Sequence, residues 1–226
     1  MKTGFSPTFV IALFVPTALA ATAITVANPQ TTSPAAHEGA GRVVYIAHLH
    51  SLNSVVTGRK AAGEARFVVD GDALVIAIDA HGLPPDMMHL QHFHGFADNR
   101  QATCPTAAAD RNGDGIIDLK ETEPMAGTTM VPFHADPVSM QIASDSYPRA
   151  SAAGTFTYRK TVSLAAFTTA FEKAFGSAAL DLDRRVVFIH GVVPSAKLPG
   201  TVASLGDIPA RITLPVACGV IERVAG

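Results

Sequence analysis

The sequence predicts an all-β domain, either an antiparallel sandwich or a barrel. Short runs of β-branched and apolar residues recur between residues 42 and 221 and are separated by turn signals, as in such folds. A single segment changes to helical spacing, so one short helix is expected on the sheet. The length of 226 residues, without internal repeats, fits one domain behind an N-terminal leader.

The first strands are expected over residues 42–49, 65–69 and 73–78. Asp70-Gly71 lies between the second and the third. Asp-Gly between two apolar runs predicts a hairpin, because both central residues of its turn take positive φ. Residues 82–85, Gly-Leu-Pro-Pro, then break the chain before a strand that carries histidines.

Further strands are expected over residues 154–162, 185–190 and 212–221, and the last range gives one or two, with Pro215 marking a break or an edge. The helix lies between the first and second of them, with Ser163 as its N-cap and Gly176 at its C-terminal end. Its apolar side chains recur at helical spacing: Leu164, Phe167, Phe171, Ala174 and Phe175. These phenylalanines are expected to pack in the core, and the alternative is a ligand pocket.

The N-terminus has the pattern of a secretory signal peptide over residues 1–20. A lysine precedes a short apolar run, and Ala-Leu-Ala ends it. The run is too short to span a bilayer, so no membrane insertion is expected. We expect a flexible leader over residues 21–39, a domain over residues 40–226, and a periplasmic or secreted protein.

Charge and cysteine content narrow the function. The net charge of −2, without a basic run, gives no electrostatic case for binding nucleic acid or anionic lipid. The two cysteines, Cys104 and Cys218, lie far apart in the sequence. In an exported protein such a pair predicts one disulfide, and the alternative is two buried free thiols.

The strongest functional signal is His89-Leu-Gln-His92-Phe-His94. Side chains alternate between the faces of a strand, so His92 and His94 point to the same side. Two imidazoles in this arrangement can bind one ion of copper, zinc, nickel or iron. The alternative is a pair of solvated histidines. A third histidine nearby and Cys104 downstream favour a metal site.

Residues 110–121 match a twelve-residue EF-hand loop. Calcium is a hard cation that takes many oxygen ligands, and the loop offers oxygens at each ligand position, with Gly115 at the sharp turn. The expected ligands are Asp110, Asn112, Asp114, the Ile116 backbone carbonyl, Asp118 and the bidentate Glu121.

This calcium-type loop lies in an insertion over about residues 105–131. Pro105 and Pro124 leave little room for flanking helices, and the sequence contains no second loop to pair with. The expected role is structural rather than sensory. The alternative is a polar surface loop that matches the pattern by chance.

Over residues 40–224 the chain resembles the copper/zinc superoxide dismutase family. Its motifs occur in the family's order: the histidine strand over residues 89–96, Cys104, a strand over residues 185–190 that ends on a histidine, and the C-terminal cysteine motif over residues 217–221. A looser match, Pro-Phe-His134-Ala-Asp-Pro, is similar to the family loop with the histidine that bridges copper and zinc.

The resemblance implies an eight-stranded Greek-key barrel with copper bound by His92, His94 and His190. It implies His134 as a fourth ligand that releases the metal on reduction and delivers a proton. His89 would be a supporting residue, and Cys104 and Cys218 would be the family's disulfide pair.

The departures from the family concern zinc and the substrate. No histidine lies between His134 and His190, where the family has two further zinc ligands, and Asp136 and Asp145 are the only nearby carboxylates. The zinc site is therefore expected to be incomplete. Pro215 replaces the arginine that attracts superoxide.

Arg211 and Lys197 are possible substitutes for that arginine. The segment after His190 is apolar where the family is charged, so steering of an anion is expected to be weak.

These observations predict an exported copper-binding protein that dismutates superoxide at a three- or four-histidine site with reduced activity. Copper suits such a site, whereas zinc in the same ligands would bring no redox chemistry. The alternatives are a non-enzymatic copper-binding or copper-buffering protein and a structural module stabilised by calcium and the disulfide. His48 and His50 form another pair on one face, either surface residues or an auxiliary metal site.

Overall fold

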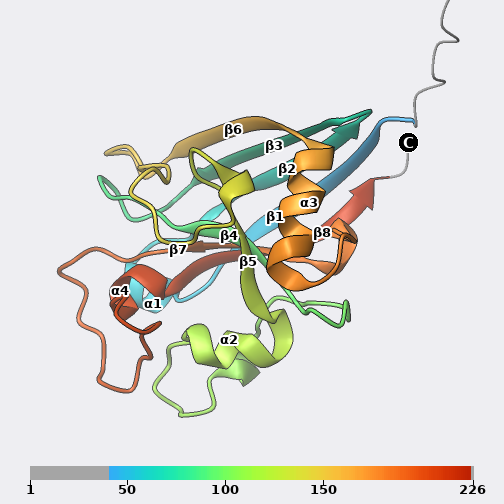
Figure 1. Ribbon diagram of the computed structural model, residues 1–226. Coiled ribbons are helices and arrows are strands. Elements are labelled where there is room, and N and C mark those ends of the chain that lie inside the picture. The colour runs from blue at the N-terminus through green and yellow to red at the C-terminus, as the bar shows by residue number, and fades with distance from the viewer. Residues whose placement is uncertain (1–40, 225–226) are drawn as a thin grey trace, which may run out of the picture. The chain divides into compact units, whose positions relative to one another are not determined.

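Eight antiparallel strands form one curled sheet, an open half-barrel (Figure 1). The structure, a computed structural model, describes residues 41–224. The strand order is β5-β4-β7-β8-β1-β2-β3-β6, so β5 and β6 are the edges. The strands are β1 (Val43–Ser51), β2 (Ala62–Asp70), β3 (Ala73–His81), β4 (Gln91–Gly95), β5 (Thr128–Pro132), β6 (Phe156–Ser163), β7 (Val186–His190) and β8 (Pro215–Val224). The predicted all-β fold is confirmed, whereas the signal peptide and the leader lie outside the described residues.

Alternation along the strands builds the core. On β3, Leu74, Ile76 and Ile78 are fully buried, while the residues between them are more exposed, as expected where one face of a sheet packs on a core. All five residues of β4 and all five of β7 are buried. Both faces of these two strands are therefore covered, and polar side chains on them lie inside the protein.

The hairpin between β2 and β3 is confirmed, but its turn lies one residue later than expected. Asp70 pairs with Ala73, so the central residues of the turn are Gly71 and Asp72. Of the two only Gly71 has positive φ, at 56°. The type II′ hairpin turn requires a glycine at its first central position. Strand β2 therefore extends to Asp70.

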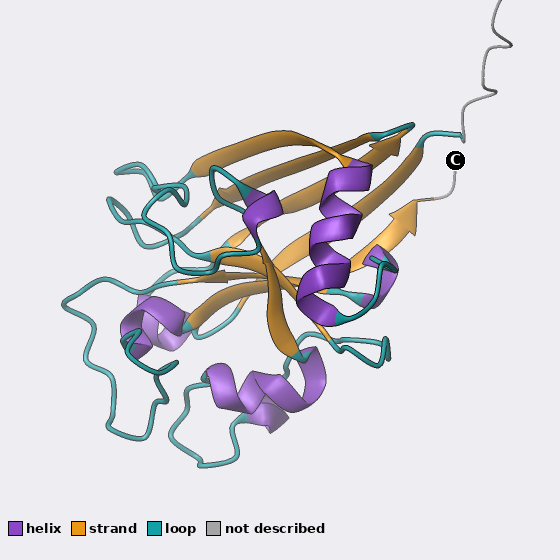
Figure 2. Ribbon diagram, viewed as in Figure 1, coloured by secondary structure: helices purple, strands orange, loops and turns teal. Residues whose placement is uncertain are grey.

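The predicted helix is α3 (Leu164–Phe175), which lies across the sheet (Figure 2). The Ser163 hydroxyl accepts the backbone N–H of Ala166 at 3.2 Å, and Gly176 ends the helix in the left-handed region. Phe167 and Phe171 are buried in the core, as expected. The ring of Phe171 lies 6.0 Å from that of Phe93 on β4.

A second helix of substantial length, α2 (Leu119–Ala126), corrects the expectation that proline leaves no room beside the calcium-type loop. Pro124 is inside this helix, two residues before its end. Pro124 removes one backbone hydrogen bond, while Asp118 and Glu121 form a capping box that stabilises the start of the helix. Strand β5 follows directly and is also absent from the sequence prediction. The single-turn helices are α1 (Ser54–Thr57) and α4 (Ala210–Thr213).

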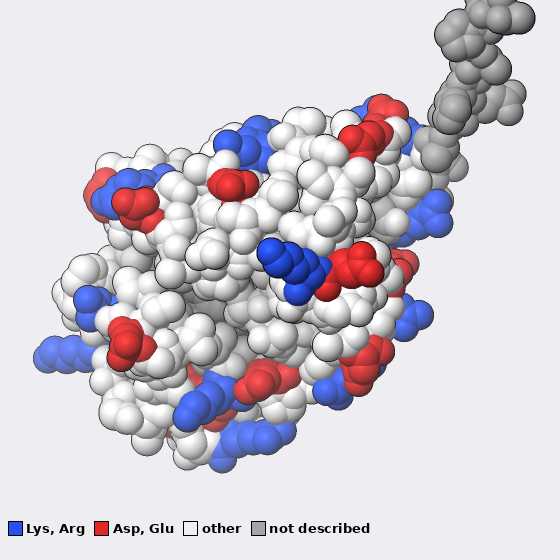
Figure 3. Space-filling view, viewed as in Figure 1, with Lys and Arg blue, Asp and Glu red and all other residues white. Residues whose placement is uncertain are grey.

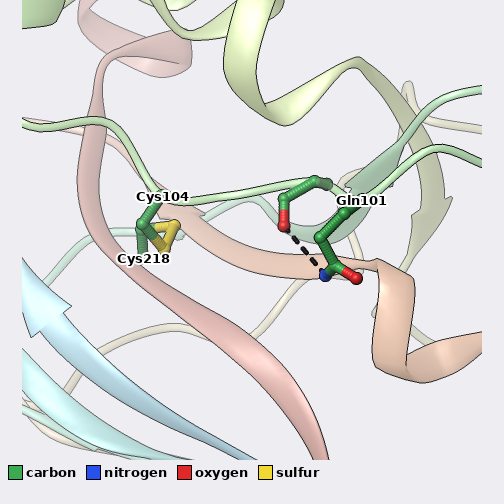
Figure 4. Close-up of a disulfide and its surroundings, with 4 residues drawn as sticks. Gln101, Cys104 and Cys218 are labelled. Atoms are coloured by element: carbon green, nitrogen blue, oxygen red, sulfur yellow. Dashed lines mark hydrogen bonds between the residues drawn. A yellow bond between two sulfur atoms is a disulfide. The ribbon is translucent and has the colours of Figure 1, made fainter.

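The predicted disulfide is confirmed. Cys104 and Cys218 are bonded, with their Cα atoms 5.8 Å apart (Figure 4). The bond fixes the segment after β4 to strand β8. The side-chain amide of Gln101, in the same segment, donates to the Asp183 carbonyl at 3.0 Å. Within the described residues, no helix is long and apolar enough to cross a membrane.

Candidate metal centre

Three predicted ligands meet in one buried group. His92 and His94 lie on one face of β4, and His190 ends the neighbouring strand β7. One possible ligand atom of each lies within 4.8 Å of the others. The ring centroids of His92 and His190 are 4.9 Å apart, and each other pair is 5.6 Å apart. Phe93, between the two β4 histidines, points to the opposite face and packs against α3.

Four ring nitrogens of this group are buried without a hydrogen-bond partner. They are both nitrogens of His92, Nδ1 of His94 and Nε2 of His190. The three residues are only 1–3 % exposed. A buried polar atom without a partner costs free energy, and a bound cation would satisfy those nitrogens that it contacts. The group therefore fits a metal ion.

Neighbouring oxygens orient two of the rings. The Nδ1–H of His190 donates to the Thr213 carbonyl at 2.7 Å, which leaves Nε2 free. Nε2 of His94 is hydrogen-bonded to the Thr129 hydroxyl at 3.3 Å, which leaves Nδ1 free. Such outer partners fix the tautomer and the direction of a metal-binding imidazole.

Burial lowers the pKa values of all three histidines. Loss of hydration, with the neighbouring His190, lowers the pKa of His94 to about 3. Loss of hydration also lowers the pKa of His190 to about 4 and that of His92 well below its usual value. The rings are therefore neutral at neutral pH, which is the form that binds a metal ion.

His89 contacts the backbone of His190 but is not part of the three-histidine group. Its Nδ1 is 2.9 Å from the His190 carbonyl, and its Nε2 is 2.8 Å from the Pro84 carbonyl. Burial lowers its pKa. These contacts connect the segment before β4 to the end of β7, and both ring nitrogens are used within the protein. A supporting role for His89 stays a prediction.

His134 lies outside the three-histidine group. Its Nε2–H donates to the Gln141 carbonyl at 2.7 Å, and its Nδ1 accepts the backbone N–H of Asp136 at 3.0 Å. Tyr147 connects it to the group, because the Tyr147 ring is 5.0 Å from that of His134 and 5.9 Å from that of His92. A fourth-ligand role for His134 stays a prediction.

A cleft leads toward the histidines. It has a volume of about 340 Å³ and ends at His94. A separate small cavity of about 10 Å³, room for about one water molecule, adjoins His92 and His190. Three apolar residues line both spaces: Leu119, Ile142 and Leu205. The space directly beside His92 and His190 is therefore small and largely apolar, whereas the outer cleft also contains polar residues.

Two opposite charges, Lys120 and Glu123, lie at this cleft, and both belong to α2. Arg211 and Lys197 are the possible substitutes for the family arginine. Neither is among the described residues that line the cleft or the small cavity. Figure 3 shows Lys and Arg interspersed with Asp and Glu over the visible face. No sequence pattern pointed to Lys120, because its position depends on how α2 packs.

The calcium-type loop has an ordered internal network. Asp110 accepts the backbone N–H groups of Gly113, Asp114 and Gly115, at 2.8 to 3.2 Å. Glu121 accepts those of Arg111 and Asn112, and Asn112 in turn accepts that of Asp114. Gly115 has φ of 82°, which suits a glycine at the sharp turn. Within the described residues, only the three histidines form a close metal-binding group, so calcium binding stays a prediction.

Four hydrogen bonds, on two sides, connect this loop to the rest of the fold. The side-chain amide of Asn53 donates to the Ile117 carbonyl at 2.8 Å and accepts the Ile117 N–H at 2.9 Å. It thereby pairs with Ile117 as a neighbouring strand would. On the other side, Asp114 accepts the Thr201 hydroxyl, and Asp118 accepts the Ala203 N–H at 2.7 Å.

No family model matches the chain, and no curated protein matches it. The resemblance to copper/zinc superoxide dismutases therefore rests on the motifs quoted from the sequence, and the function is inferred from the residues of this chain.

Proposed function

We propose that the protein is an exported copper-binding protein whose His92, His94 and His190 hold a single copper ion. The observation that carries the proposal is the set of buried, unpartnered ring nitrogens in this group. Three imidazoles suit copper, zinc, nickel and iron, and the family resemblance favours copper. The disulfide fits an oxidising compartment, periplasmic or extracellular.

The proposed reaction is dismutation, in which two superoxide anions and two protons give oxygen and hydrogen peroxide. Bound copper would supply the one-electron chemistry, accepting an electron from one superoxide and donating one to the next. The protein contributes neutral ligands, orients two of them through Thr213 and Thr129, and restricts access through the small, largely apolar cavity beside His92 and His190. Lys120 attracts the anion, but Glu123 opposes it.

The test of the copper site is metal analysis of the double variant His92→Ala/His94→Ala. We expect the unmodified protein to retain a single copper ion after loading and dialysis, and the variant to lose it. His81→Ala is the matched control, because His81 is an exposed histidine on β3. Circular dichroism checks that each variant is folded. Full copper retention by a folded double variant contradicts the proposal.

A second candidate is copper storage without catalysis. The narrow, apolar approach favours it, because an anion crossing such a surface loses hydration. A superoxide assay on copper-loaded protein with its disulfide intact separates the two functions. Measurable dismutation supports the enzyme, and its absence assigns the protein to copper binding alone.

The proposal includes a structural calcium ion in the loop over residues 110–121. The ligand spacing, the glycine turn and the network of Asp110 support it. Because Asp118 is the N-cap of α2, calcium would also rigidify the helix that carries Leu119, Lys120 and Glu123 to the cleft. Calcium would then stabilise the wall of the copper site as well as the loop.

A further inference from the structure

His48 and His50 repeat, on the surface, the arrangement of the buried pair. Both lie on β1, and the buried Leu49 between them shows that they share the exposed face. Residues two apart on a strand are about 7 Å apart along it. The same spacing brings ligand atoms of His92 and His94 within 4.8 Å of each other. Spacing alone therefore allows His48 and His50 to bind one ion, although together with Glu64 they do not already form a close group among the described residues.

Two carboxylates lie next to this pair. Glu64, on β2, is directly opposite His48, and its Oε2 is 4.0 Å from the His48 Nδ1. Glu222, on β8, borders the same surface depression as the two histidines. The side chains of His48 and Glu64 are 69 % and 45 % exposed, so they can turn toward an ion without disturbing the core.

The depression provides space for an ion and its remaining water ligands. It has a volume of about 230 Å³ and lies beside the disulfide, because Cys104 also lines it and Cys218 pairs with His50. Strand β1 is held between β2 and β8, so the backbone that carries the histidines is rigid. A rigid base, an open side and access from solvent are the features expected of an exchangeable metal site.

We propose that His48, His50 and Glu64 form a second, solvent-accessible site for zinc or copper(II). Two imidazoles and a carboxylate are a donor set that both ions accept, and the open positions are left to water. This site shares no residue with the buried group and does not depend on the proposed function. Glu222 adds negative charge at the rim.

The test is equilibrium dialysis of the full chain against zinc, with elemental analysis. We expect His48→Ala/His50→Ala to bind one zinc ion fewer than the unmodified protein. His81→Ala is the matched control, because His81 is exposed but does not line the depression, and it should bind as much zinc as the unmodified protein. Glu64→Gln should weaken zinc binding at this site about tenfold, as loss of a ligand or its close partner does.

Nuclear magnetic resonance of the unmodified protein provides an independent readout. Added zinc should shift the ring signals of His48 and His50 and leave those of His81 unchanged. Equal zinc binding by the double variant and the unmodified protein overturns the proposal. An equal loss in His81→Ala, or an equal shift of the His81 signals, also overturns it by showing unspecific binding to exposed imidazoles.

Discussion

At the scale of single residues, the buried histidines depend on neighbours that are distant in sequence. Thr213 leaves Nε2 of His190 free, and Thr129 leaves Nδ1 of His94 free. His92 has no partner for either nitrogen. Such a group is unfavourable in a metal-free protein, since its polar atoms have lost water without gaining hydrogen bonds.

The first prediction is that the metal-free protein loses stability as the pH falls below about 6.5, the usual pKa of an unfolded-chain histidine. His94 and His190 have folded pKa values of about 3 and about 4. Between these values and 6.5 the unfolded chain binds protons that the folded chain does not, so the free energy of unfolding decreases with falling pH.

Urea denaturation at several pH values between 8 and 4 measures this dependence. The variant His190→Gln should show a shallower dependence, because one titrating group is missing. Constant stability of the metal-free protein between pH 7 and pH 4.5 contradicts the prediction. The carboxyl groups of Asp72 and Asp79 also have lowered pKa values, but because they start from 3.8 their effect is concentrated at and below the acid end of this range.

At the scale of elements, α2 connects the calcium-type loop to the metal centre. Its capping residues, Asp118 and Glu121, are proposed calcium ligands. Three other residues of the helix line the cleft: Leu119, Lys120 and Glu123. The segment over residues 201–205 is part of the same unit, because Asp114 and Asp118 bind Thr201 and Ala203, and Leu205 lines the cleft.

The second prediction concerns calcium. The unmodified protein should melt at a higher temperature in millimolar calcium than in chelator, because a ligand that binds only the folded state stabilises it. Glu121→Ala should abolish this difference and leave copper binding intact. Glu121→Gln is the matched variant, since it retains an oxygen for the N–H groups of Arg111 and Asn112 but loses the charge. An unmodified protein with the same melting temperature in both conditions excludes the calcium site.

The third prediction concerns the charges at the cleft. Superoxide dismutation should be well below the diffusion limit and depend little on ionic strength, because Lys120 and Glu123 nearly cancel. Lys120→Gln should lower the rate a few-fold, and Glu123→Gln should raise it by a similar factor. Lys197→Gln is the control, because Lys197 does not line the cleft.

Steady-state rates at low and high salt test the charge prediction. A near-maximal rate that falls steeply with salt would falsify weak steering and would direct attention to Arg211 and Lys197.

At the scale of the whole molecule, the disulfide joins two segments that are far apart in the sequence. Cys104 and Cys218 are 114 residues apart. The bond joins the segment after β4 to β8, and Cys218 pairs with Phe188 on β7. The three-histidine group lies on β4 and β7, so the disulfide connects segments next to the metal centre.

The fourth prediction is that Cys104→Ala/Cys218→Ala lowers the free energy of unfolding by about 2–5 kcal/mol, mainly because the unfolded chain gains freedom. Urea denaturation of the metal-free proteins measures the difference, and the reduced unmodified protein serves as control. Two free thiols in freshly isolated protein, found by mass spectrometry, would contradict the bond itself.

Short-range sequence patterns predicted many local features of the fold. Alternation along β4 placed His92 and His94 on one face, and the caps Ser163 and Gly176 defined α3. Asp-Gly located the first hairpin to within one residue. These predictions are correct because each depends on residues that lie within a few positions of each other in the sequence. The order of the family motifs also proposed His190 as the third ligand.

Only the tertiary structure decided which distant groups share a space. It placed His190 within reach of β4, left four ring nitrogens without partners, and put Asn53 against Ile117. The structure also contains α2, which the sequence analysis did not predict because of Pro124, and this helix places Lys120 at the cleft. Burial, hydration and access depend on packing between strands and loops far apart in the chain. Residue types and spacing therefore predicted the candidate ligands, whereas packing determined their environment.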